Sequence, residues 1–178
     1  MRHITLLTDY GTREGLHTVL KGVIWKILPD AMIADITHHI DPQNIFQAAL
    51  ALMRAADYFP DGSVHIVAVD PGKGRKKKGM AARLGDQFFV GPDNGVCTPL
   101  LDLAKGDPDS IEAVELANSR YWLDAVNPIF LGRDIFAPVG AYLASGVQLA
   151  EFGPPMDHIN RITIPQPQAA EGGLVGEV

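Results

Sequence analysis

The chain has one cysteine and no long hydrophobic run, and both absences limit what kind of protein it can be. Its 178 residues contain only Cys97, so no disulfide can form within the chain. Cys97 lies in the apolar stretch GVCTPLL, where a small buried hydrophobic side chain is the simplest interpretation. No run approaches the roughly 18 to 20 uncharged residues that span a bilayer, and the first apolar strand begins almost at Met1. We therefore expect no signal peptide, no membrane anchor and a reducing, cytoplasmic setting.

Positive charge is also scarce. The chain carries 15 Lys and Arg against 21 Asp and Glu, a net charge of −6, whereas nucleic-acid-binding proteins usually have a basic surplus on one face. The one basic cluster, Arg75–Lys78, contains no aromatic residue, and we interpret it as a solvated loop with one base pointing inward. A small molecule is therefore the expected partner, rather than nucleic acid.

No metal or phosphate motif is present either. None of the six histidines is spaced as in HExxH, and the adjacent His38 and His39 would face apart on regular structure. Gly72 and Gly74 fit neither GxxxxGK[ST] nor GxGxxG. We expect no bound metal and no cofactor.

What the chain does have is a regular alternation of apolar patterns in its first half. Short apolar runs have the length of buried strands, and between them apolar residues recur at helical spacing. Asp41 is a predicted helix N-cap, with Pro42 at the first helical position. The predicted elements are strands at residues 4–7, 31–36 and 64–69 and helices at 16–27 and 42–56. This β-α-β-α-β order predicts an α/β fold with a parallel sheet and right-handed crossovers.

The second half predicts further elements and ends unusually. Gly85-Asp86 lies between two apolar runs and favours a hairpin, and Thr98-Pro99 favours the start of a helix. Another strand is predicted at residues 113–116, and a late helix at 132–145 closed by Gly146.

The tail has the composition of a linker. Residues 165–173 are rich in Pro, Gln, Ala and Gly, and residues 174–178 then begin an apolar strand with no sequence left to pair with. We therefore predict an α/β domain over residues 1–164, a linker over 165–173, and the first strand of a truncated β-rich domain over 174–178.

Asp70 is the most informative single residue. It closes the apolar run Val64–Val69 and opens the sequence DPGKGRKKK. An open α/β sheet binds its ligands beyond the carboxyl ends of the strands, which is where this acid falls. We therefore expect Asp70 to do chemistry.

Five motifs occur together and in order along nearly the whole chain. They are TDYG at 8–11, HHIDPQNIFQAA at 38–49, YFPDGSVHIVAVDPGKG at 58–74, GPDNG at 91–95 and FLGRDIFAP at 130–138. Together they resemble the S-adenosylmethionine hydroxide adenosyltransferases, the former domain-of-unknown-function 62 family, which also contains the fluorinase and the chlorinase.

The resemblance implies a fold, an assembly and a reaction. The fold is a three-layer sandwich around a mostly parallel sheet. In the implied homotrimer, this domain and a small C-terminal β-barrel of the neighbouring subunit form the site together, and GGLVGEV would start that barrel. The reaction is attack on C5′ of S-adenosylmethionine by water or hydroxide, which gives adenosine and methionine without a metal.

The resemblance also assigns binding residues one by one. Asp9 matches an aspartate that takes both ribose hydroxyls, because a carboxylate can accept two hydrogen bonds; the alternative is an acid that caps the following loop. Glu14 matches an acid near the substrate's ammonium group, and its alternative is an exposed acid in the first helical turn. Gln43 matches a side chain placed against the ribose.

Five further positions belong to this set. Asp93 and Asn94 match a loop near the site, although both residues are also ordinary turn formers. Tyr10, Lys73 and Leu131 complete the residues that the resemblance places around the substrate.

In the hydrolytic members of the family, an Asp, an Arg and a His hold the attacking water. The matching positions here are Asp70, Lys77 and Leu131. Lysine lacks the planar fork of arginine, and leucine cannot form a hydrogen bond. Loss of the histidine predicts a reaction slower by about 10²- to 10⁴-fold, roughly 3 to 5 kcal/mol, unless Arg75 or Lys78 substitutes. Asp70 still favours water over halide, because a carboxylate repels halide and the halogenating relatives lack this acid.

Three functions remain open on the sequence. The first is hydrolysis of S-adenosylmethionine, with Asp70 and Lys77 as the catalytic residues. The second is a silent homologue that binds S-adenosylmethionine or adenosine, and the third is a structural trimer module. Arg133-Asp134 is interpreted as an ion pair that fixes the loop carrying Leu131.

Overall fold

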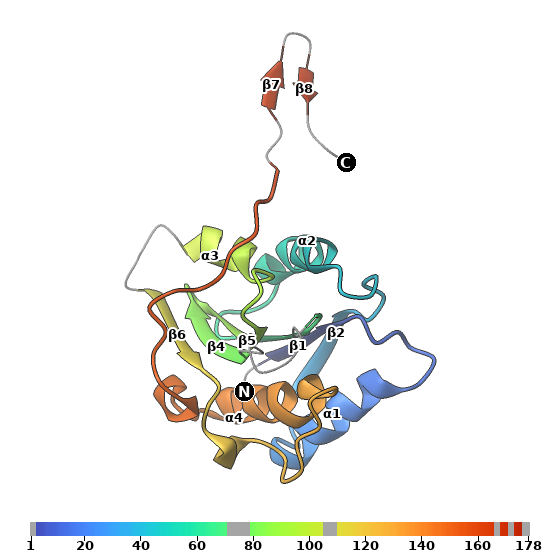
Figure 1. Ribbon diagram of the computed structural model, residues 1–178, viewed down its shortest axis with the longest axis vertical. Helices are drawn as coiled ribbons and strands as arrows, with labels where there is room; N and C mark the ends of the chain where they lie inside the picture. The colour runs from blue at the N-terminus through green and yellow to red at the C-terminus, as the bar shows by residue number, and fades with distance from the viewer. Residues whose placement is uncertain (1–2, 71–78, 105–109, 166–167, 171–172, 176–178) are drawn as a thin grey trace.

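The computed structural model describes residues 3–70, 79–104, 110–165, 168–170 and 173–175. Its body is a six-stranded sheet between two layers of helices (Figure 1). The strands are β1 (His3–Thr8), β2 (Met32–Thr37), β3 (Val64–Ala68), β4 (Gly79–Leu84), β5 (Gln87–Pro92) and β6 (Ile111–Glu115). The α-helices are α1 (Leu16–Ile27), α2 (Ile45–Ala55), α3 (Thr98–Ala104) and α4 (Ala137–Ser145). Shorter helical turns are η1 (Ala56–Tyr58), η4 (Ser119–Tyr121), η5 (Gly132–Phe136) and η6 (Leu149–Phe152).

The sheet has the strand order β2-β1-β3-β5-β4-β6. Strands β2, β1, β3 and β5 run parallel, and β4 is antiparallel to both β5 and β6. The predicted α/β fold with a mostly parallel sheet is confirmed. So is the hairpin at Gly85-Asp86, which joins β4 to β5.

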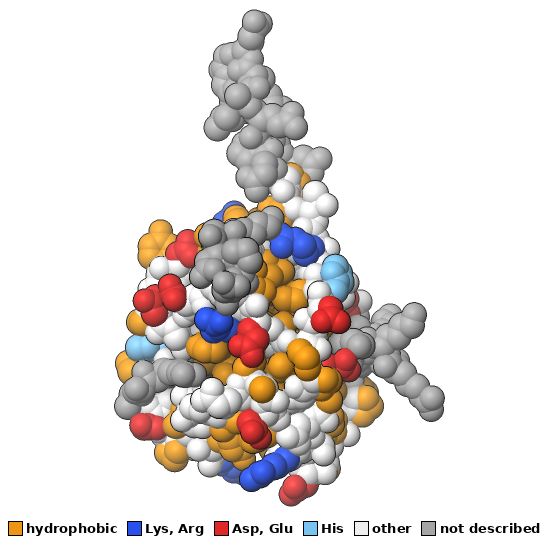
Figure 2. Space-filling view, turned by 90° about the vertical axis from the view of Figure 1, so that its left-hand side faces the viewer, with side chains coloured by type: hydrophobic (Ala, Val, Ile, Leu, Met, Phe, Trp, Pro, Cys, Tyr) orange, Lys and Arg blue, Asp and Glu red, His pale blue; other side chains and the backbone are white. Residues whose placement is uncertain are grey.

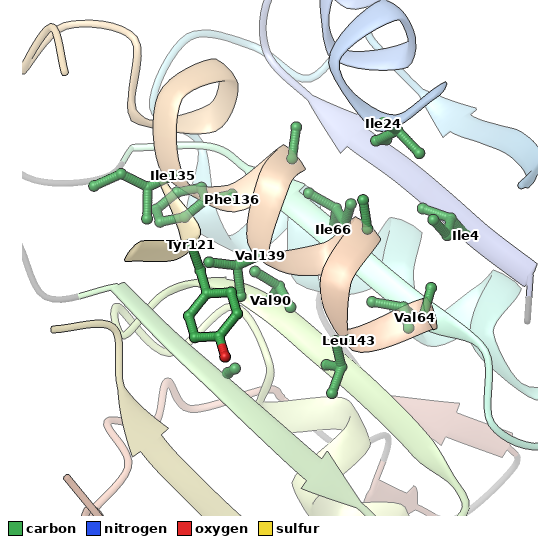
Figure 3. Close-up of a cluster of buried hydrophobic side chains, with 14 of the residues drawn as sticks. Ile4, Ile24, Val64, Ile66, Val90, Tyr121, Ile135, Phe136, Val139 and Leu143 are labelled. Atoms are coloured by element: carbon green, nitrogen blue, oxygen red, sulfur yellow. The ribbon is translucent and has the colours of Figure 1, made fainter. Parts of the chain in front are cut away.

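Two separate cores hold the layers together. Helices α1 and α4 cover one face of the sheet, and α2 and α3 cover the other. Figure 3 shows the first core, where side chains of the sheet meet those of α1 and α4; among them are Ile4, Ile24, Val64, Ile66, Val139 and Leu143. Helix α4 approaches β3 closely because Gly140 has no side chain: a Cβ there would lie 2.7 Å from Cγ1 of Ile66. The second core contains Cys97, which is fully buried as expected, and burial raises the pKa of its thiol to about 12.

The second helix begins later than the sequence predicts. Asn44, not Asp41, is the N-cap of α2, because its side chain accepts a hydrogen bond of 2.9 Å from the backbone N–H of Gln47. The Gln47 side chain in turn accepts from the backbone N–H of Asp41 at 2.7 Å, so this pair closes the turn before the helix. Strand β2 also differs from its prediction. It lies at the edge of the sheet and is partly exposed, rather than buried.

The late helix is present but starts with a π-turn. Residues Gly132–Phe136 form η5, and α4 continues from Ala137 until Gly146 ends it at a φ of 108°. Pro138 has no N–H to donate to the carbonyl of Asp134 one turn earlier. That carbonyl instead accepts from the backbone N–H of Leu123 at 2.9 Å. The π-turn therefore ties the residues that follow Leu131 to a neighbouring loop.

The tail forms a short hairpin that stands away from the body (Figure 1). Strand β8 (Gly173–Val175) pairs antiparallel with β7 (Gln168–Ala170), so Leu174 has a partner inside the segment predicted as a linker. The expectation that this strand would find nothing to pair with is therefore wrong. A two-stranded hairpin alone is marginally stable in water, and the predicted boundaries at 164 and 173 stay a prediction. None of the helices in the described residues is long and apolar enough to span a bilayer.

One histidine is buried inside the sheet itself. His65 on β3 has no exposed surface, and its Nδ1 lies 2.8 Å from Oγ1 of Thr5 on the adjacent β1. Burial lowers the pKa of His65 to about 4, although the nearby side chain of Gln87 acts in the opposite direction. His65 is therefore neutral in the folded protein at pH 7.

The free energy of unfolding should consequently fall on acidification. Between the unfolded pKa of about 6.5 and the folded pKa of about 4, the unfolded state binds more protons. The contribution of His65 is complete above pH 6.5 and is lost as the pH falls towards 4, by about 3 kcal/mol. Urea unfolding at pH 7, 5.5 and 4 measures the loss, and His65→Gln removes the titrating group. If the variant loses as much stability as the parent over this range, another group is responsible.

Candidate functional site

Several residues that the sequence singled out follow strands that end at one edge of the sheet. Strands β1, β3 and β5 are parallel, so their carboxyl ends meet there. In the register, Thr8 of β1 lies opposite Ala68 of β3. Asp9 follows the first strand directly, and Asp70 stands two residues beyond the second. Two acids remote in sequence are thus placed on neighbouring strand ends, where open α/β sheets bind ligands.

Asp70 is held in an unusual backbone conformation. Its φ is +41°, in the left-handed region that residues other than glycine rarely adopt. The side-chain amide of Asn94 donates to the carbonyl oxygens of Val69 and Asp70, at 3.1 and 2.9 Å. Asn94, which follows β5, therefore binds the end of β3 and fixes the backbone from which the Asp70 side chain projects. Strain held in this way by surrounding bonds is typical of functional positions.

Asp9 and Gln43 are joined directly. The backbone N–H of Gln43 donates to Oδ2 of Asp9 at 3.0 Å, and Gln43 has a φ of +65°. Gln43 and Asp70 are the two residues other than glycine with positive φ in the described part of the chain. The alternative prediction was that Asp9 caps the loop that follows it. Asp9 does accept a hydrogen bond from a backbone N–H, but this N–H belongs to the β2–α2 connection. No described residue donates to Oδ1, which leaves it free for a ligand hydroxyl.

Tyr10 and Leu131 lie at the same edge. Gly132 packs against the loop after β1 and against β3: a Cβ on it would overlap the Tyr10 hydroxyl and lie 2.8 Å from Cβ of Ala68. This approach brings the buried Leu131 to the carboxyl ends of the strands. Burial raises the pKa of Tyr10 to about 12, with the negative charge of Asp9 as the next cause. The Tyr10 hydroxyl therefore stays protonated.

Arg133 and Asp134 have the structural role expected from the sequence. Nε of Arg133 lies 2.5 Å from Oδ1 of the fully buried Asp134. Oδ2 of Asp134 accepts from the backbone N–H of Asn127 at 2.7 Å and from Nη2 of Arg133 at 3.0 Å. These bonds lock the turn after Leu131.

The structure also shows the surroundings of two further predicted site residues. Glu14 is exposed and precedes Gly15, the N-cap of α1. Its structural alternative is wrong, because the first turn of α1 contains no acidic residue. Asp93 binds Asn160. The backbone N–H and the side-chain amide of Asn160 donate to the two carboxylate oxygens of Asp93, at 2.8 and 2.9 Å. In this structure Asp93 anchors the segment that follows η6.

Lys73 and Lys77 lie outside the described residues, as do Arg75 and Lys78. In the part of the chain that the structure does describe, no group of three or more His, Cys, Asp and Glu is arranged to hold a metal ion. Figure 2 shows the face at the β6 edge, where the coloured Lys and Arg side chains are scattered among acids and apolar residues rather than gathered.

Three surface hollows formed by described residues lie away from this edge. The largest of the three, about 380 Å³, is bounded by α3, β6 and residues 156–161. Others of about 280 and 200 Å³ lie by the β4–β5 turn and by the end of α4. None of these three includes Asp9 or Asp70.

Sequence reasoning missed a buried polar pair beneath the site. Oγ1 of Thr8 lies 2.9 Å from Nδ1 of His38, and both side chains are buried. The available signal was that a polar residue, Thr8 or His38, closely follows each of two predicted strands, at residues 4–7 and 31–36. Recognising the pair needs the pairing of β1 with β2, in which Leu7 lies opposite Thr37.

A family model described as the SAM hydroxide adenosyltransferase N-terminal domain matches residues 4–153. The chain belongs to this family. Within the SAM hydroxide adenosyltransferase family, it is 41% identical over 165 residues to the (R)-S-adenosyl-L-methionine hydrolase of Salinispora tropica, covering 92% of this chain and 61% of that protein. A fluorinase from Actinoplanes sp. is more distant, at 25% identity over 98% of this chain and 66% of the fluorinase.

The fold comparison agrees. The crystal structure of an uncharacterized conserved protein from Thermotoga maritima matches with a TM-score of 0.86 and 36% identity, covering 93% of this chain and 63% of that one. The chain thus spans about 61 to 66% of the length of these three relatives. The family that the five motifs resembled is confirmed.

Proposed function

We propose that this chain forms the α/β part of an enzyme that hydrolyses S-adenosyl-L-methionine to adenosine and L-methionine. The family supports this proposal, as do the relatives named (R)-S-adenosyl-L-methionine hydrolase at 35 to 41% identity. The observation that carries it is the fixed backbone of Asp70, which Asn94 and a left-handed conformation hold two residues past β3. Asp9 supplies a second acid on the adjacent strand end.

The reaction needs few groups from the protein, because the substrate carries its own cationic leaving group. The oxygen of a water molecule forms a bond to C5′ while the C5′–sulfonium bond breaks, and its electron pair leaves with sulfur as the neutral thioether of methionine. The proton of the attacking water passes to Asp70. Catalysis then depends on orientation, on exclusion of bulk water and on electrostatics. No metal or cofactor takes part in this proposal.

The remaining residues take binding roles. Asp9 accepts from the ribose hydroxyls with the oxygen that Gln43 leaves free, and Gln43 lies beside the sugar. Tyr10 and Leu131 line the same edge, Glu14 and Lys73 contact the polar ends of the substrate, and Lys77 holds the water with Asp70. Asn94 acts on Asp70 rather than on the substrate.

Water is the preferred nucleophile over halide. A halide ion at the position of the attacking water would be repelled by the Asp70 carboxylate, whereas a water molecule can donate a hydrogen bond to it. We therefore place this chain with the hydrolases and not with its fluorinase relatives.

The proposal includes an assembly. The complete enzyme would be a homotrimer whose site lies between subunits, as the family resemblance implies. Light scattering after gel filtration measures the mass of the particle. The single buried Cys97 fits a reducing compartment, and we propose a cytoplasmic location.

Hydrolysis is tested by product analysis. This chain, and any longer translation product of its gene, is incubated with each sulfonium epimer of S-adenosyl-L-methionine at pH 7 to 9. Equal amounts of adenosine and methionine are expected, with preference for the R epimer. The names of the relatives carry the prefix (R), which refers to the sulfonium centre because L already specifies the α-carbon of the amino acid. No adenosine above background from either protein would count decisively against the proposal.

A second function is favoured by Leu131, which is buried and cannot orient water. In this alternative the protein binds S-adenosylmethionine or adenosine without turning it over. Calorimetry that gives tight binding, together with absent product, selects this function over hydrolysis.

A further inference from the structure

A line of polar contacts runs beneath the strand ends from the surface to β1. Nζ of Lys21 lies 2.6 Å from Oδ2 of Asp35, and Oδ1 of Asp35 lies 3.1 Å from Nε2 of His38. The other ring nitrogen of His38 contacts Oγ1 of Thr8 at 2.9 Å. Thr8 Oγ1 also accepts from the backbone N–H of Tyr10 at 3.3 Å. The line therefore ends inside the loop that carries Asp9.

The partners fix where the protons lie. Asp35 offers only acceptor atoms, so Nε2 of His38, which faces it in a contact too bent for a straight hydrogen bond, carries the ring proton. Nδ1 is then an acceptor, and the Thr8 hydroxyl donates to it. The Thr8 oxygen keeps its lone pairs for the N–H of Tyr10.

His38 is neutral in this arrangement. It is 4% exposed, and burial lowers its pKa, while Asp35 acts in the opposite direction and His17 and Lys21 reinforce the lowering. The ring of His17 packs against it with centroids 4.7 Å apart. Protonation at Nδ1 would reverse the Thr8 hydrogen bond and disturb the Tyr10 contact.

The backbone of His38 holds the same loop. Its carbonyl oxygen accepts from the N–H of Gly11 at 2.7 Å, and Gly11 has a φ of +64° that other residues adopt at a cost. Asp9 thus lies between Thr8 and Tyr10, which share a hydrogen bond, and two residues before the His38-bound Gly11. Its carboxylate receives its own bond from Gln43.

We propose that His38 is a positioning residue which, through Thr8, fixes the loop of residues 9–12 and thereby aims the Asp9 carboxylate. The ligand-binding consequence rests on the proposed function, in which Asp9 accepts from the ribose. The neutral tautomer and the rigid loop are properties of the protein alone.

The sheet supplies a matched control. Thr5 and His65 form the same pair, with Oγ1 to Nδ1 at 2.8 Å and both side chains buried, but three residues earlier on β1. Thr5→Val and Thr8→Val therefore remove the same chemical group from the same strand. A purely structural role predicts the same outcome for both variants.

The first measurement compares ligands. Calorimetry on the parent protein and both variants gives dissociation constants for adenosine and for 2′,3′-dideoxyadenosine, which lacks the diol. Thr8→Val should reduce the preference for adenosine by about tenfold, the effect of one weakened hydrogen bond to a charged group. Thr5→Val should keep the parent preference while lowering the melting temperature by a similar amount. Unchanged preference in Thr8→Val overturns the proposal.

The second measurement needs no ligand. Nitrogen-15 NMR of the imidazole should show His38 protonated on Nε2, and hydrogen exchange of the Tyr10 and Gly11 amides should accelerate in Thr8→Val but not in Thr5→Val. An Nδ1-protonated ring, or equal exchange in all three proteins, refutes the positioning role. If these results hold but the parent protein shows no preference for the diol, the ribose assignment of Asp9 fails and the loop assignment stands.

Discussion

Replacing Asp70 by asparagine should lower the rate of S-adenosylmethionine hydrolysis by about 10²- to 10⁴-fold, the usual contribution of a positioned general base. Asparagine has nearly the same shape but cannot accept the proton of the attacking water. It is also among the residues that best tolerate the left-handed φ of +41° found here. The carbonyl of residue 70 can still accept from Asn94, so the end of β3 should keep its conformation. The measurement is adenosine release under saturating substrate, with kcat and KM determined separately.

A matched control distinguishes chemistry from charge. Asp86 is an exposed acid in the turn between β4 and β5, at the opposite end of the sheet from the candidate site. Asp86→Asn removes the same unit of charge and should leave kcat unchanged. A parent-like kcat in Asp70→Asn would remove Asp70 from the mechanism, and an equal loss in both variants would point to a general electrostatic effect.

The parts of the fold that the sequence predicted well are those with strong, local periodicity. Helix α1 begins and ends where the spacing of apolar residues placed it, at Leu16 and Ile27. The apolar run before Asp70 became the fully buried β3. Such patterns predict the structure well because the periodicity within one strand or helix determines which of its residues are buried.

The errors have two causes, competition between local signals and the order of the strands in the sheet. Asp41-Pro42 has the composition of a helix start, yet Asn44 accepts from the N–H of Gln47 and so moves the start to Ile45. The Gln47 side chain accepts from the N–H of Asp41, which stays outside the helix. Strand β2 has an apolar run suited to the centre of a sheet but lies at its edge. Edge position depends on strand order, which no single segment encodes.

The site was predictable to the extent that it follows from strand ends. Because parallel strands finish at one edge, the order of the strands and acids along the chain was enough to place Asp9 and Asp70 together. The surroundings of Asp93 and Glu14 could not be predicted, because the first is held by Asn160, 67 residues away, and the second precedes the N-cap of α1 instead of entering its first turn. The contact of Thr8 with His38 spans 30 residues and could not be read from either segment by itself.

Changing Leu131 to histidine together with Lys77 to arginine should raise the rate by about 10²- to 10⁴-fold, reversing the substitutions that separate this chain from the hydrolytic pattern. Leu131 stands beside Gly132, which is packed against Tyr10 and β3, so a histidine there would project from a fixed turn at the same edge as Asp70. The imidazole would orient the water that Asp70 deprotonates, and the two groups would act as a unit. The gain should therefore disappear when Asp70→Asn is added. Leu131→Met, which keeps an apolar side chain of similar volume, serves as the control and should not change the rate. If the double variant binds S-adenosylmethionine but gains nothing, the orientation of the bound sulfonium, rather than the missing imidazole, limits this protein.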